Sequence, residues 1–402
     1  MPAFAAVMTG KGAAAIATIL VFGDAAEAVT KKMFKHAGGK PAEFEVGRIL
    51  LGAIIDPLRQ ETIDQVTIGC EGTNSFAINC HGNPLIVEMI MQILQRNGIT
   101  LLPAEELLAK MLIAQKPADT IAVETKLAQL RAQTIEGAKI IANQVDSGLG
   151  KKAQQWLQDI DKTPLEKIMG DAEQILCDSQ TAKLIIDGSR VVLAGPPNTG
   201  KSTLLNCLAG RQKAIVSDIK GTTRDWVLAR CRFGPLAVEL IDTAGLGETL
   251  ASARKNTIEK AAQKKTAEIL EQADLVLLVL DSSQPEASLD ERFVGKIGKK
   301  KVLTVLNKSD LPAGLDTNKL PEILGERVHI SAKFGTGIEN LTRKILQISG
   351  VADFDLRTAV CITRRQENLL KQLARIKSKK QAVALVTELL NGQVQGAMPA
   401  KK

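Results

Sequence analysis

One stretch of the chain has the residue types and spacing of a phosphate-binding loop. Residues 190–203 read RVVLAGPPNTGKST, where a short β-type run leads into a glycine- and proline-rich turn and then a helical pattern. Glycines let successive backbone N–H groups curl around a phosphate, and the helix start adds partial positive charge. Lys201 would reach the β- and γ-phosphates, and the Ser202 hydroxyl would bind Mg²⁺. The other loop residues expected to contact the nucleotide are Gly195, Asn198, Thr199, Gly200 and Thr203.

Two further stretches would complete the magnesium and γ-phosphate side of this site. The run AVELID ends at Asp242, which can hold Mg²⁺ through a water, and Gly245 follows with an N–H that can contact the γ-phosphate. The segment SDIKGTTRD lies between the two motifs, and its Thr223 can complete the Mg²⁺ shell, with Thr222 as a further nucleotide contact. The predicted magnesium ligands are therefore Ser202, Thr223 and Asp242.

Two later stretches have the residues that recognise guanine. The run KVLTVL leads into NKSD, whose Asp310 can accept both N–H donors of guanine's Watson–Crick edge. Adenine has a different edge and would leave Asp310 desolvated and unpaired, which makes such a site selective. In the stretch HISAK, the backbone of Ser331 and Ala332 can donate to the guanine O6. The other expected base-side residues are Asn307, Lys308 and Lys333.

Each short motif has an ordinary structural alternative when taken alone. Asp242 could cap a helix, and NKSD could be a plain turn. However, the motifs follow one another in order, and each comes at the carboxyl end of a predicted strand. Ligands of open α/β sheets bind at those strand ends. The sequence therefore predicts a guanine-nucleotide site.

These motifs resemble one known family. The stretch GPPNTGKSTLLNCLAGRQKAIVSDIKGTTRD, with DTAGL, NKSD and SAK, resembles the bacterial tRNA modification GTPase family MnmE/TrmE. The nucleotide-binding part begins late in the chain, near residue 187, and a short helical tail follows it. The segment NSFAINCHGNP also resembles part of that family's folate-binding domain. Ribosome-assembly GTPases share the same nucleotide motifs, so a role in ribosome assembly is a weaker alternative.

The resemblance implies a cofactor set and a mechanism. It implies a homodimeric GTPase that uses GTP, Mg²⁺ and K⁺, and that modifies a tRNA wobble uridine with a flavin-dependent partner enzyme. In that family an asparagine of the phosphate loop coordinates K⁺, here Asn198, and the backbone between Ser217 and Gly221 would close over the ion. Such a cation offsets charge that develops in the transition state, so the expected catalytic residues are Asn198, Lys201 and Thr223. Asn198 could instead be an ordinary turn residue.

The resemblance also implies a site for 5-formyltetrahydrofolate near Cys80 and His81. The family has a second glycine after its Cys-His pair, and this chain has Asn83 there. The family's stretch rich in Gly, Glu and Phe reads LPAEELLAKMLIAQK here, without the glycine and the aromatic residue. Folate binding and a purely structural His81 are therefore both open.

Arg254, the missing terminal cysteine motif and the altered folate stretch support an alternative function, and Lys220 is a further departure from the family pattern. Counting through DTAGLGETLASARKNTIEKA places Arg254 where the family has a glutamate that positions water, with Glu248 and Glu259 as nearby acids. Lys220 falls in the expected potassium loop, where it could mimic the ion or be a solvated lysine. The sequence ends NGQVQGAMPAKK, without the family's terminal cysteine motif. The alternative is a GTP-binding switch or assembly module that hydrolyses GTP slowly or not at all.

Hydrophobic periodicity divides the chain into four segments. Residues 1–105 mix β-type and helical runs, 106–186 are amphipathic helices, 187–350 form the G domain, and 351–402 are helical with a frayed end. An undocked helical tail would expose its apolar face, so we expect it to pack on the helices of the second segment. The predicted fold is multidomain: an N-terminal α+β domain, which dimerises in the family, and a split α-helical domain with an inserted α/β P-loop GTPase domain.

Composition limits the remaining classes. The 402 residues are 45% hydrophobic and 24% charged, which excludes a disordered, collagenous or coiled-coil chain. Aromatic residues make up 3% with no Tyr, which argues against a base-stacking RNA platform. A net charge of +8 permits an RNA partner, and Lys377, Lys379 and Lys380 are either an RNA contact or a solvated helix face. Scattered cysteines and the lack of a membrane-spanning run predict a cytoplasmic protein without a membrane partner.

Overall fold

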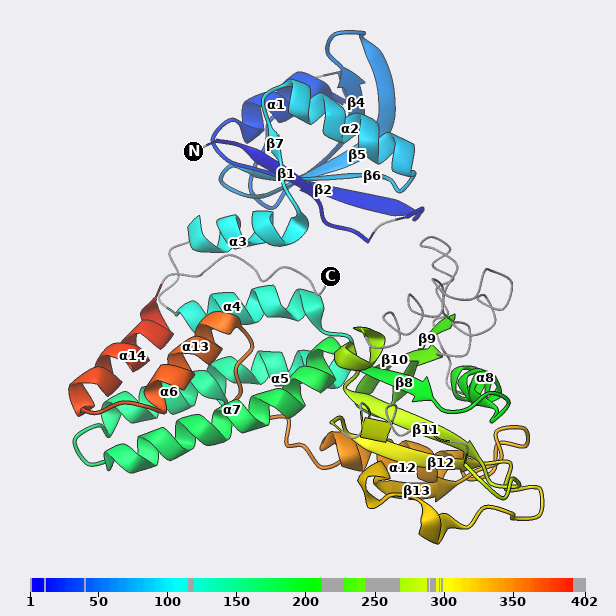
Figure 1. Cartoon of the computed structure of the whole chain (residues 1–402). Helices are drawn as coiled ribbons and strands as arrows, with labels where there is room; N and C mark the ends of the chain where they lie inside the picture. Colours follow the sequence, from blue (N-terminus) through cyan, green and yellow to red (C-terminus); the bar gives the residue numbers. More distant parts are fainter. Residues whose placement is uncertain are drawn as a thin grey trace. The chain divides into compact units, whose positions relative to one another are not determined.

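The structure is a computed structural model. It describes residues 2–10, 12–39, 41–114, 119–211, 227–242, 268–287, 289, 294–295, 297 and 299–392 (Figure 1). The chain divides into two units, Met1–Leu130 with Asn391–Lys402, and Arg131–Leu390. Within the described ranges, no helix is both long enough and apolar enough to cross a membrane.

The first unit is built on a mostly antiparallel sheet of seven strands. The strand order is β3-β4-β5-β6-β2-β1-β7, and the parallel pair is β1 with β7. The strands are β1 Phe4–Val7, β2 Ile16–Phe22, β3 Phe34–His36, β4 Ile49–Asp56, β5 Glu61–Gly72, β6 Ser75–His81 and β7 Thr100–Leu101. The helices are α1 Ala26–Met33, α2 Pro84–Arg96, α3 Ala104–Ala114 and α4 Thr120–Ala128.

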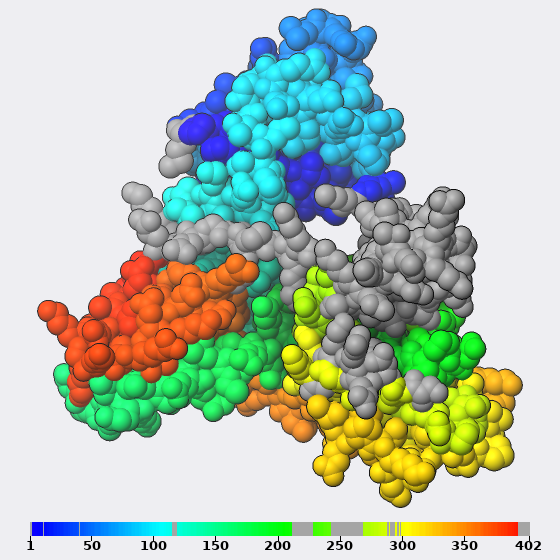
Figure 2. All heavy atoms as spheres, viewed as in Figure 1, coloured from blue at the N-terminus to red at the C-terminus, as the bar shows by residue number. Residues whose placement is uncertain are grey.

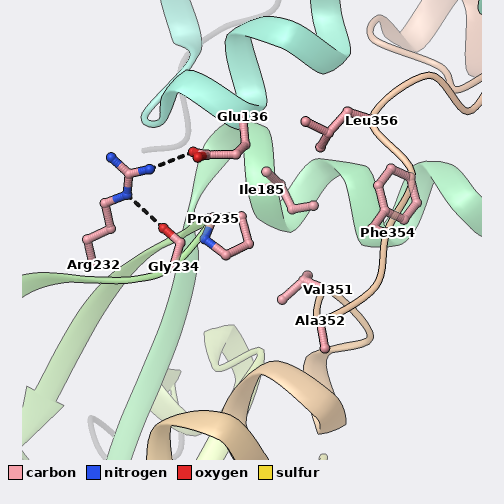
Figure 3. Close-up of a pocket in the computed structure, with 9 residues that line it drawn as sticks. All are labelled: Glu136, Ile185, Arg232, Gly234, Pro235, Val351, Ala352, Phe354 and Leu356. Atoms are coloured by element: carbon pink, nitrogen blue, oxygen red, sulfur yellow. Dashed lines mark hydrogen bonds and ion pairs between the residues drawn. The ribbon is translucent and has the colours of Figure 1, made fainter.

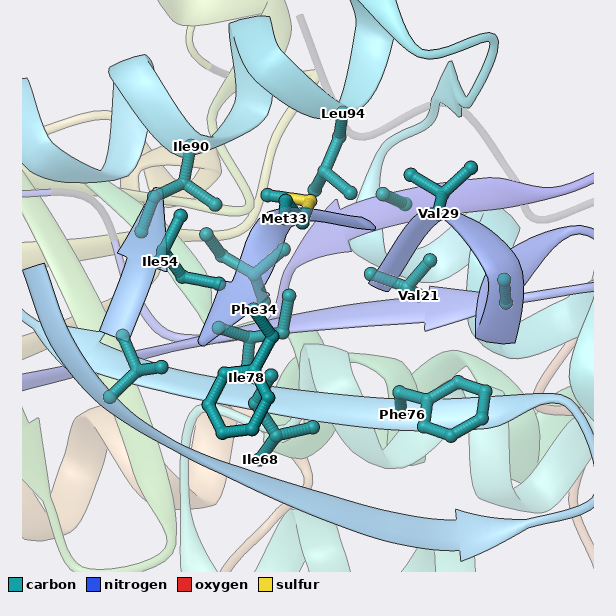
Figure 4. Close-up of a cluster of buried hydrophobic side chains, with 14 of the residues drawn as sticks. Val21, Val29, Met33, Phe34, Ile54, Ile68, Phe76, Ile78, Ile90 and Leu94 are labelled. Carbon is teal, nitrogen blue, oxygen red and sulfur yellow. The ribbon is translucent and has the colours of Figure 1, made fainter. Parts of the chain in front are cut away.

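One face of this sheet packs under helices. Side chains alternate between the two faces of a strand, so every second apolar residue reaches the same core. Ile54, Ile68 and Ile78 of three adjacent strands pack with Ile90 and Leu94 of α2 (Figure 4). The same cluster includes Val21, Val29, Met33, Phe34 and Phe76. Burying these side chains removes from water the apolar area that stabilises the α+β domain.

The opposite face is only partly covered. Cross-strand register places Ile49, Gly69, Ala77, Leu20 and Ala6 in one row from β4 to β1. At the β1 end, the side chains of this row are buried in a small cluster with a residue of α3. At the β4 end, Ile49 is 68% exposed. The sheet therefore has an exposed apolar edge on this face.

The second unit combines helices with a six-stranded sheet. Its helices are α5 Ile135–Asp146, α6 Leu149–Gln158, α7 Leu165–Asp187, α8 Lys201–Arg211, α12 Ile338–Ser349, α13 Arg364–Leu373 and α14 Lys379–Asn391. Its strands are β8 Ser189–Ala194, β9 Val227–Phe233, β10 Leu236–Asp242, β11 Leu275–Asp281, β12 Val302–Asn307 and β13 Glu326–His329. Short 3-10 helices are η1 Gln129–Arg131, η2 Thr317–Lys319 and η3 Glu322–Leu324.

The strand order of this sheet is β13-β12-β11-β8-β10-β9. All pairs are parallel except β9 with β10. Strands β11 and β12 are buried along almost their whole length, as expected for parallel strands covered on both faces. Their continuous apolar sequences, LVLLVLD and VLTVLN, follow from that burial. This is the α/β P-loop domain that the sequence predicts.

The helical part is interrupted by this sheet, which confirms the predicted split. The chain leaves α7 directly into β8 and returns to the helices after α12. Helices α5 and α13 both pack on α7. Figure 2 shows the orange and red atoms of α13 and α14 lying directly against the green atoms of α6 and α7. The returning helices therefore bury the apolar face that they would otherwise expose.

Residues 350–363 form the returning segment between α12 and α13, and one buried amide makes two of the hydrogen bonds that hold it. Gln144 of α5 is fully buried. Its Nε2 donates to the carbonyls of Ile140 (2.9 Å) and Thr358 (3.1 Å), and its Oε1 accepts from the N–H groups of Leu149 (3.0 Å) and Val360 (2.9 Å). The segment pairs with no strand among the described residues, so side chains such as Gln144 supply hydrogen bonds that its buried backbone requires.

Replacing this amide should destabilise the helical domain. Gln144→Ala leaves the N–H groups of Leu149 and Val360 without their acceptor and opens a cavity, so we expect a loss of about 2–4 kcal/mol in the free energy of unfolding. Urea denaturation followed by circular dichroism measures this change. Gln174→Ala is the control, because Gln174 is exposed and its side chain donates to Asp178 on its own helix. Equal midpoints for the two variants would contradict the role given to Gln144.

Candidate nucleotide site

The described parts of the predicted nucleotide motifs meet at one edge of the second sheet. Leu193 of β8 pairs with Asp242 of β10, and Asp281 of β11 pairs with Asn307 of β12. The parallel register therefore brings the carboxyl ends of four neighbouring strands together. The crevice outside these ends is where open α/β sheets bind ligands.

Three residues of the phosphate loop have left-handed backbone conformations. The φ angles are +139° at Gly195, +61° at Asn198 and +90° at Gly200. A Cβ atom on Gly195 would lie 2.2 Å from the Val279 carbonyl oxygen, and one on Gly200 would lie 2.3 Å from Asn307 Nδ2. Both positions therefore require glycine, for conformation and for space. Helix α8 begins directly after this turn, so its N-terminus is part of the site.

Lys201 lies inside the loop rather than in solvent. Its ammonium donates to the carbonyl oxygens of Gly195 (3.0 Å) and Pro196 (2.7 Å), and the residue is 5% exposed. Burial lowers the pKa of Lys201 below its ordinary value, and the Asp242 carboxylate opposes this shift. The site therefore holds a desolvated cation beside the turn that would surround a phosphate.

Two oxygen atoms of the predicted magnesium ligands are adjacent. Ser202 Oγ donates to Asp242 Oδ2 at 2.6 Å, and Asp242 is 1% exposed. Mg²⁺ prefers oxygen ligands and uses few protein groups, keeping waters and substrate phosphates for the rest of its shell. A hydroxyl and a carboxylate side by side at the loop fit this ion.

On the base side, a buried amide joins three loops. Asn307 Nδ2 donates to the Thr199 carbonyl at 2.8 Å, and Asn307 Oδ1 accepts from the Ala332 N–H at 2.9 Å. Ser331 Oγ donates to Asp310 Oδ1 at 2.6 Å. The phosphate loop, the NKSD loop and the SAK loop are therefore linked by side-chain hydrogen bonds, and Asp310 is held where the predicted base edge would lie.

The structure also places Asp281, which the sequence analysis did not predict, beside the predicted residue Lys308. Lys308 Nζ lies 2.7 Å from Asp281 Oδ2, and the other carboxylate oxygen accepts from the N–H (3.0 Å) and hydroxyl (2.7 Å) of Ser283. Burial by itself would raise the pKa of Asp281, but the hydrogen bonds from Lys308 and Ser283 outweigh it and lower the pKa. The signal was present, because LVLLVLD is an apolar strand that ends in an aspartate, as AVELID is.

The remaining predicted residues are placed as follows. Thr203 lies exposed on α8, and Lys333 is exposed with its Nζ 5.2 Å from the centre of the Phe334 ring. The predictions for nine other positions fall outside the described residues: Ser217, Lys220, Gly221, Thr222, Thr223, Gly245, Glu248, Arg254 and Glu259.

Cys80 and His81 lie at the end of β6 in the first unit and differ in exposure. Cys80 is buried in the sheet core, where burial is the largest cause that raises the pKa of its thiol. The His81 side chain is 68% exposed, and its Nδ1 lies 2.7 Å from Asp64 Oδ1. The His81 N–H also donates to Asp64 Oδ2 at 2.8 Å. The carboxylate therefore orients an imidazole whose other ring atoms face solvent.

Comparison with known proteins agrees with this geometry. The family model described as 50S ribosome-binding GTPase matches residues 190–308, and the model described as GTP-binding protein TrmE N-terminus matches residues 3–106. The tRNA modification GTPase MnmE of Desulforamulus reducens is 30% identical over 379 residues, covering 85% of this chain and 81% of that protein. The chain belongs to the MnmE/TrmE family.

Other members of the family match over more of the chain. MnmE of Alkaliphilus oremlandii is 26% identical, and the match covers 92% of this chain and 86% of that protein. MnmE of Enterococcus faecalis is 27% identical, and the match covers 98% of this chain and 89% of that protein. As a member of this family with a P-loop GTPase domain, the protein is a GTP-hydrolysing enzyme that binds GTP and Mg²⁺.

A methyl group on the last loop glycine should abolish tight nucleotide binding. In Gly200→Ala the new Cβ is strained at φ +90° and collides with the Asn307 amide, so we expect GTP affinity to fall more than tenfold. Titration with a fluorescent GTP analogue measures this. Gly210→Ala in α8 is the control, because a Cβ there meets nothing within 4 Å, and its affinity should match the wild type. An unchanged affinity in Gly200→Ala would contradict the binding geometry.

Proposed function

We propose that this enzyme uses GTP, Mg²⁺ and K⁺ to modify the wobble uridine of tRNA, together with a flavin-dependent partner enzyme. The observation that carries the proposal is the meeting of Lys201, Asp242 and Asn307 at one sheet edge in a chain whose N-terminal part matches the TrmE family model. The relatives named tRNA modification GTPases support the same substrate class.

In this proposal the phosphate side of the site neutralises charge. Lys201 leaves its two carbonyl partners for the stronger β- and γ-phosphate acceptors, and the N–H groups from Asn198 to Thr203 surround the phosphates. Ser202 and Asp242, with Thr223, would hold Mg²⁺, which supplies positive charge to the phosphates. Asn198 is exposed at the loop surface, which leaves its side chain accessible for its proposed role as a K⁺ ligand. Its left-handed backbone fits an ordinary turn residue equally well.

The base side provides selectivity in the same proposal. Asp310 accepts from the guanine N–H groups, and the backbone of Ser331 and Ala332 donates to O6. Ser331 already orients the Asp310 carboxylate, so this side chain loses little conformational freedom when the base binds. Lys308 and Lys333 flank the base pocket, and Asn307 keeps the loops together.

The N-terminal domain has features that support two finer proposals. The exposed apolar row at the β4 end, with Ile49 and Leu51, supports homodimerisation through this face. His81, oriented by Asp64, supports a polar ligand such as 5-formyltetrahydrofolate at the end of β6. We further propose that the domain boundaries lie at residues 105, 186 and 350. We also propose that the protein is cytoplasmic.

Potassium dependence tests the proposed mechanism. Single-turnover hydrolysis of GTP should be at least about tenfold faster in KCl than in NaCl, because a fixed cation beside the β–γ bridge acts as an arginine finger does. Asn198→Ala should lose this stimulation, whereas Asn318→Ala, at an exposed position of η2, should retain it.

The same measurement tests the alternative. Arg254 stands where the family's water-positioning glutamate is expected, and its side chain cannot accept a proton from water, which motivates a slowly hydrolysing GTP switch or assembly module. Negligible hydrolysis in both salts, with GTP still bound, would support that switch and contradict the potassium mechanism. A chain that does not bind GTP would contradict both.

We also propose the route by which the nucleotide state reaches the helices. Strand β10 ends at Asp242, and its far end joins β9 through a turn at Gly234 and Pro235. At that end, Arg232 Nη2 lies 2.6 Å from Glu136 Oε2 of α5 (Figure 3). This ion pair borders a cavity of about 550 Å³ where α5, α7 and the returning segment meet the turn, which leaves room for movement. The β9–β10 hairpin therefore connects the metal ligand to the helical domain.

Neutralising the helix side of this ion pair should uncouple the two parts. In the wild type we expect hydrogen exchange in α5 to differ between the GTP-analogue and GDP states, and Glu136→Gln should reduce that difference by at least half. GTP affinity should stay within about twofold, because the pair lies at the opposite end of the strand from the site. Glu173→Gln, at an exposed position of α7, is the control. A wild-type difference that persists in Glu136→Gln would contradict this route.

A further inference from the structure

Asp281 and Lys308 come from neighbouring strands and form a close ion pair beside the base loop. Asp281 is the last residue of β11 and Asn307 the last of β12, and the two are directly paired in the sheet. The Asp281 side chain is 9% exposed and that of Lys308 34%. The pair therefore lies at the edge where the nucleotide loops meet, in a partly desolvated position where a charge pair is stronger than on the surface.

The carboxylate is oriented independently of the lysine. Its Oδ1 accepts two hydrogen bonds from Ser283, so Oδ2 is directed at the lysine ammonium, 2.7 Å away. The Ser282 N–H donates to the Asn307 carbonyl at 2.9 Å, which joins the turn after β11 to the start of the NKSD loop. The acceptor for Lys308 is thus set by backbone and side-chain bonds that the lysine does not make.

Lys308 itself has an unfavourable backbone conformation. Its φ angle is +63°, in the left-handed region that a residue with a Cβ seldom adopts because of steric strain. Lys308 lies between Asn307, which binds two loops, and Asp310, which would accept from the base in the proposed site. An interaction that holds the Lys308 side chain therefore helps to keep the strained turn and, with it, the relative positions of these two residues.

We infer that Asp281 is a positioning residue for guanine recognition, acting through Lys308 on the loop that carries Asp310. The inference rests on the proposed guanine-nucleotide site and adds to it a determinant of specificity from a strand end outside the predicted nucleotide motifs. The mechanism requires no contact between Asp281 and the nucleotide. Loss of the carboxylate frees Lys308, the turn relaxes, and Asp310 no longer meets both guanine N–H groups.

Nucleotide competition tests this inference. Affinities for GTP and ITP are measured on the full chain by displacement of a fluorescent GDP analogue; ITP lacks the 2-amino group of guanine. In Asp281→Ala we expect GTP affinity to fall about tenfold and ITP affinity to fall less, so that the preference for GTP shrinks. A merely structural role would lower both affinities by the same factor, and that result would overturn the inference.

Two further variants separate the charge from the fold. Asp281→Asn keeps the shape and its contacts with Ser283, and should reproduce the loss of preference even where the alanine variant is unstable. The double variant Asp281→Ala/Lys308→Ala should bind no more weakly than Lys308→Ala, because the aspartate acts through the lysine. Additive losses would overturn the inference. Asp316→Ala is the control, since Asp316 pairs with Lys319 at an exposed position.

A wild-type chain that does not displace the fluorescent GDP analogue with GTP would contradict the proposed function itself. A wild type that binds GTP, with Asp281 variants that retain its full preference over ITP, would contradict only the positioning role. The two failures are therefore distinguishable in one set of titrations.

Discussion

The nucleotide site depends on the buried amide of Asn307. Its two polar atoms bind the Thr199 carbonyl and the Ala332 N–H, so one side chain links the phosphate loop to both loops of the base side. Leaving either partner buried and unpaired would cost about 1–3 kcal/mol. The absence of a side chain at Gly200 is part of the same constraint, because a Cβ there would occupy the space of this amide. Gly200 of the phosphate loop and Asn307 of the NKSD loop are distant in the sequence, but each can be accommodated only in the presence of the other.

Around this amide, the site concentrates charge in a poorly solvated place. Lys201 and Asp242 are both nearly buried, and each is held by hydrogen bonds within the site. Preorganised charges of this kind act strongly on a bound triphosphate because little reorganisation is needed. Burial of the apolar strands β11 and β12, which lie under the site, stabilises the fold and offsets the free-energy cost of desolvating these charges.

The helical domain is a single packed structure made from two separate pieces of chain. Its second piece enters as a segment that pairs with no strand in the described part of the chain, and side chains of α5 and α7 supply several of its hydrogen bonds. Gln144 holds Thr358 and Val360, and Ser179 accepts from the Cys361 N–H at 2.8 Å. An insertion between α7 and this segment is tolerated because the contacts on either side form independently of what lies between. The nucleotide domain is thus attached at two adjacent points.

The sequence by itself determined the fold class and most of the nucleotide site. The glycines, Lys201, Asp242 and NKSD belong to short motifs whose backbone conformation and strand-end position are local properties. Alternation along β6 also separates Cys80 from His81, since successive side chains of a strand face opposite sides. The sequence analysis had placed both Cys80 and His81 near one folate site without considering that their side chains face opposite sides of the strand.

Only the tertiary structure decided the pairs that join distant segments. Asp281 with Lys308, Asp64 with His81 and Arg232 with Glu136 are 27, 17 and 96 residues apart. Each partner is an ordinary polar residue in its own segment. Strand order, register and domain docking choose among many such residues, and those arrangements arise from packing the whole core rather than from any local pattern.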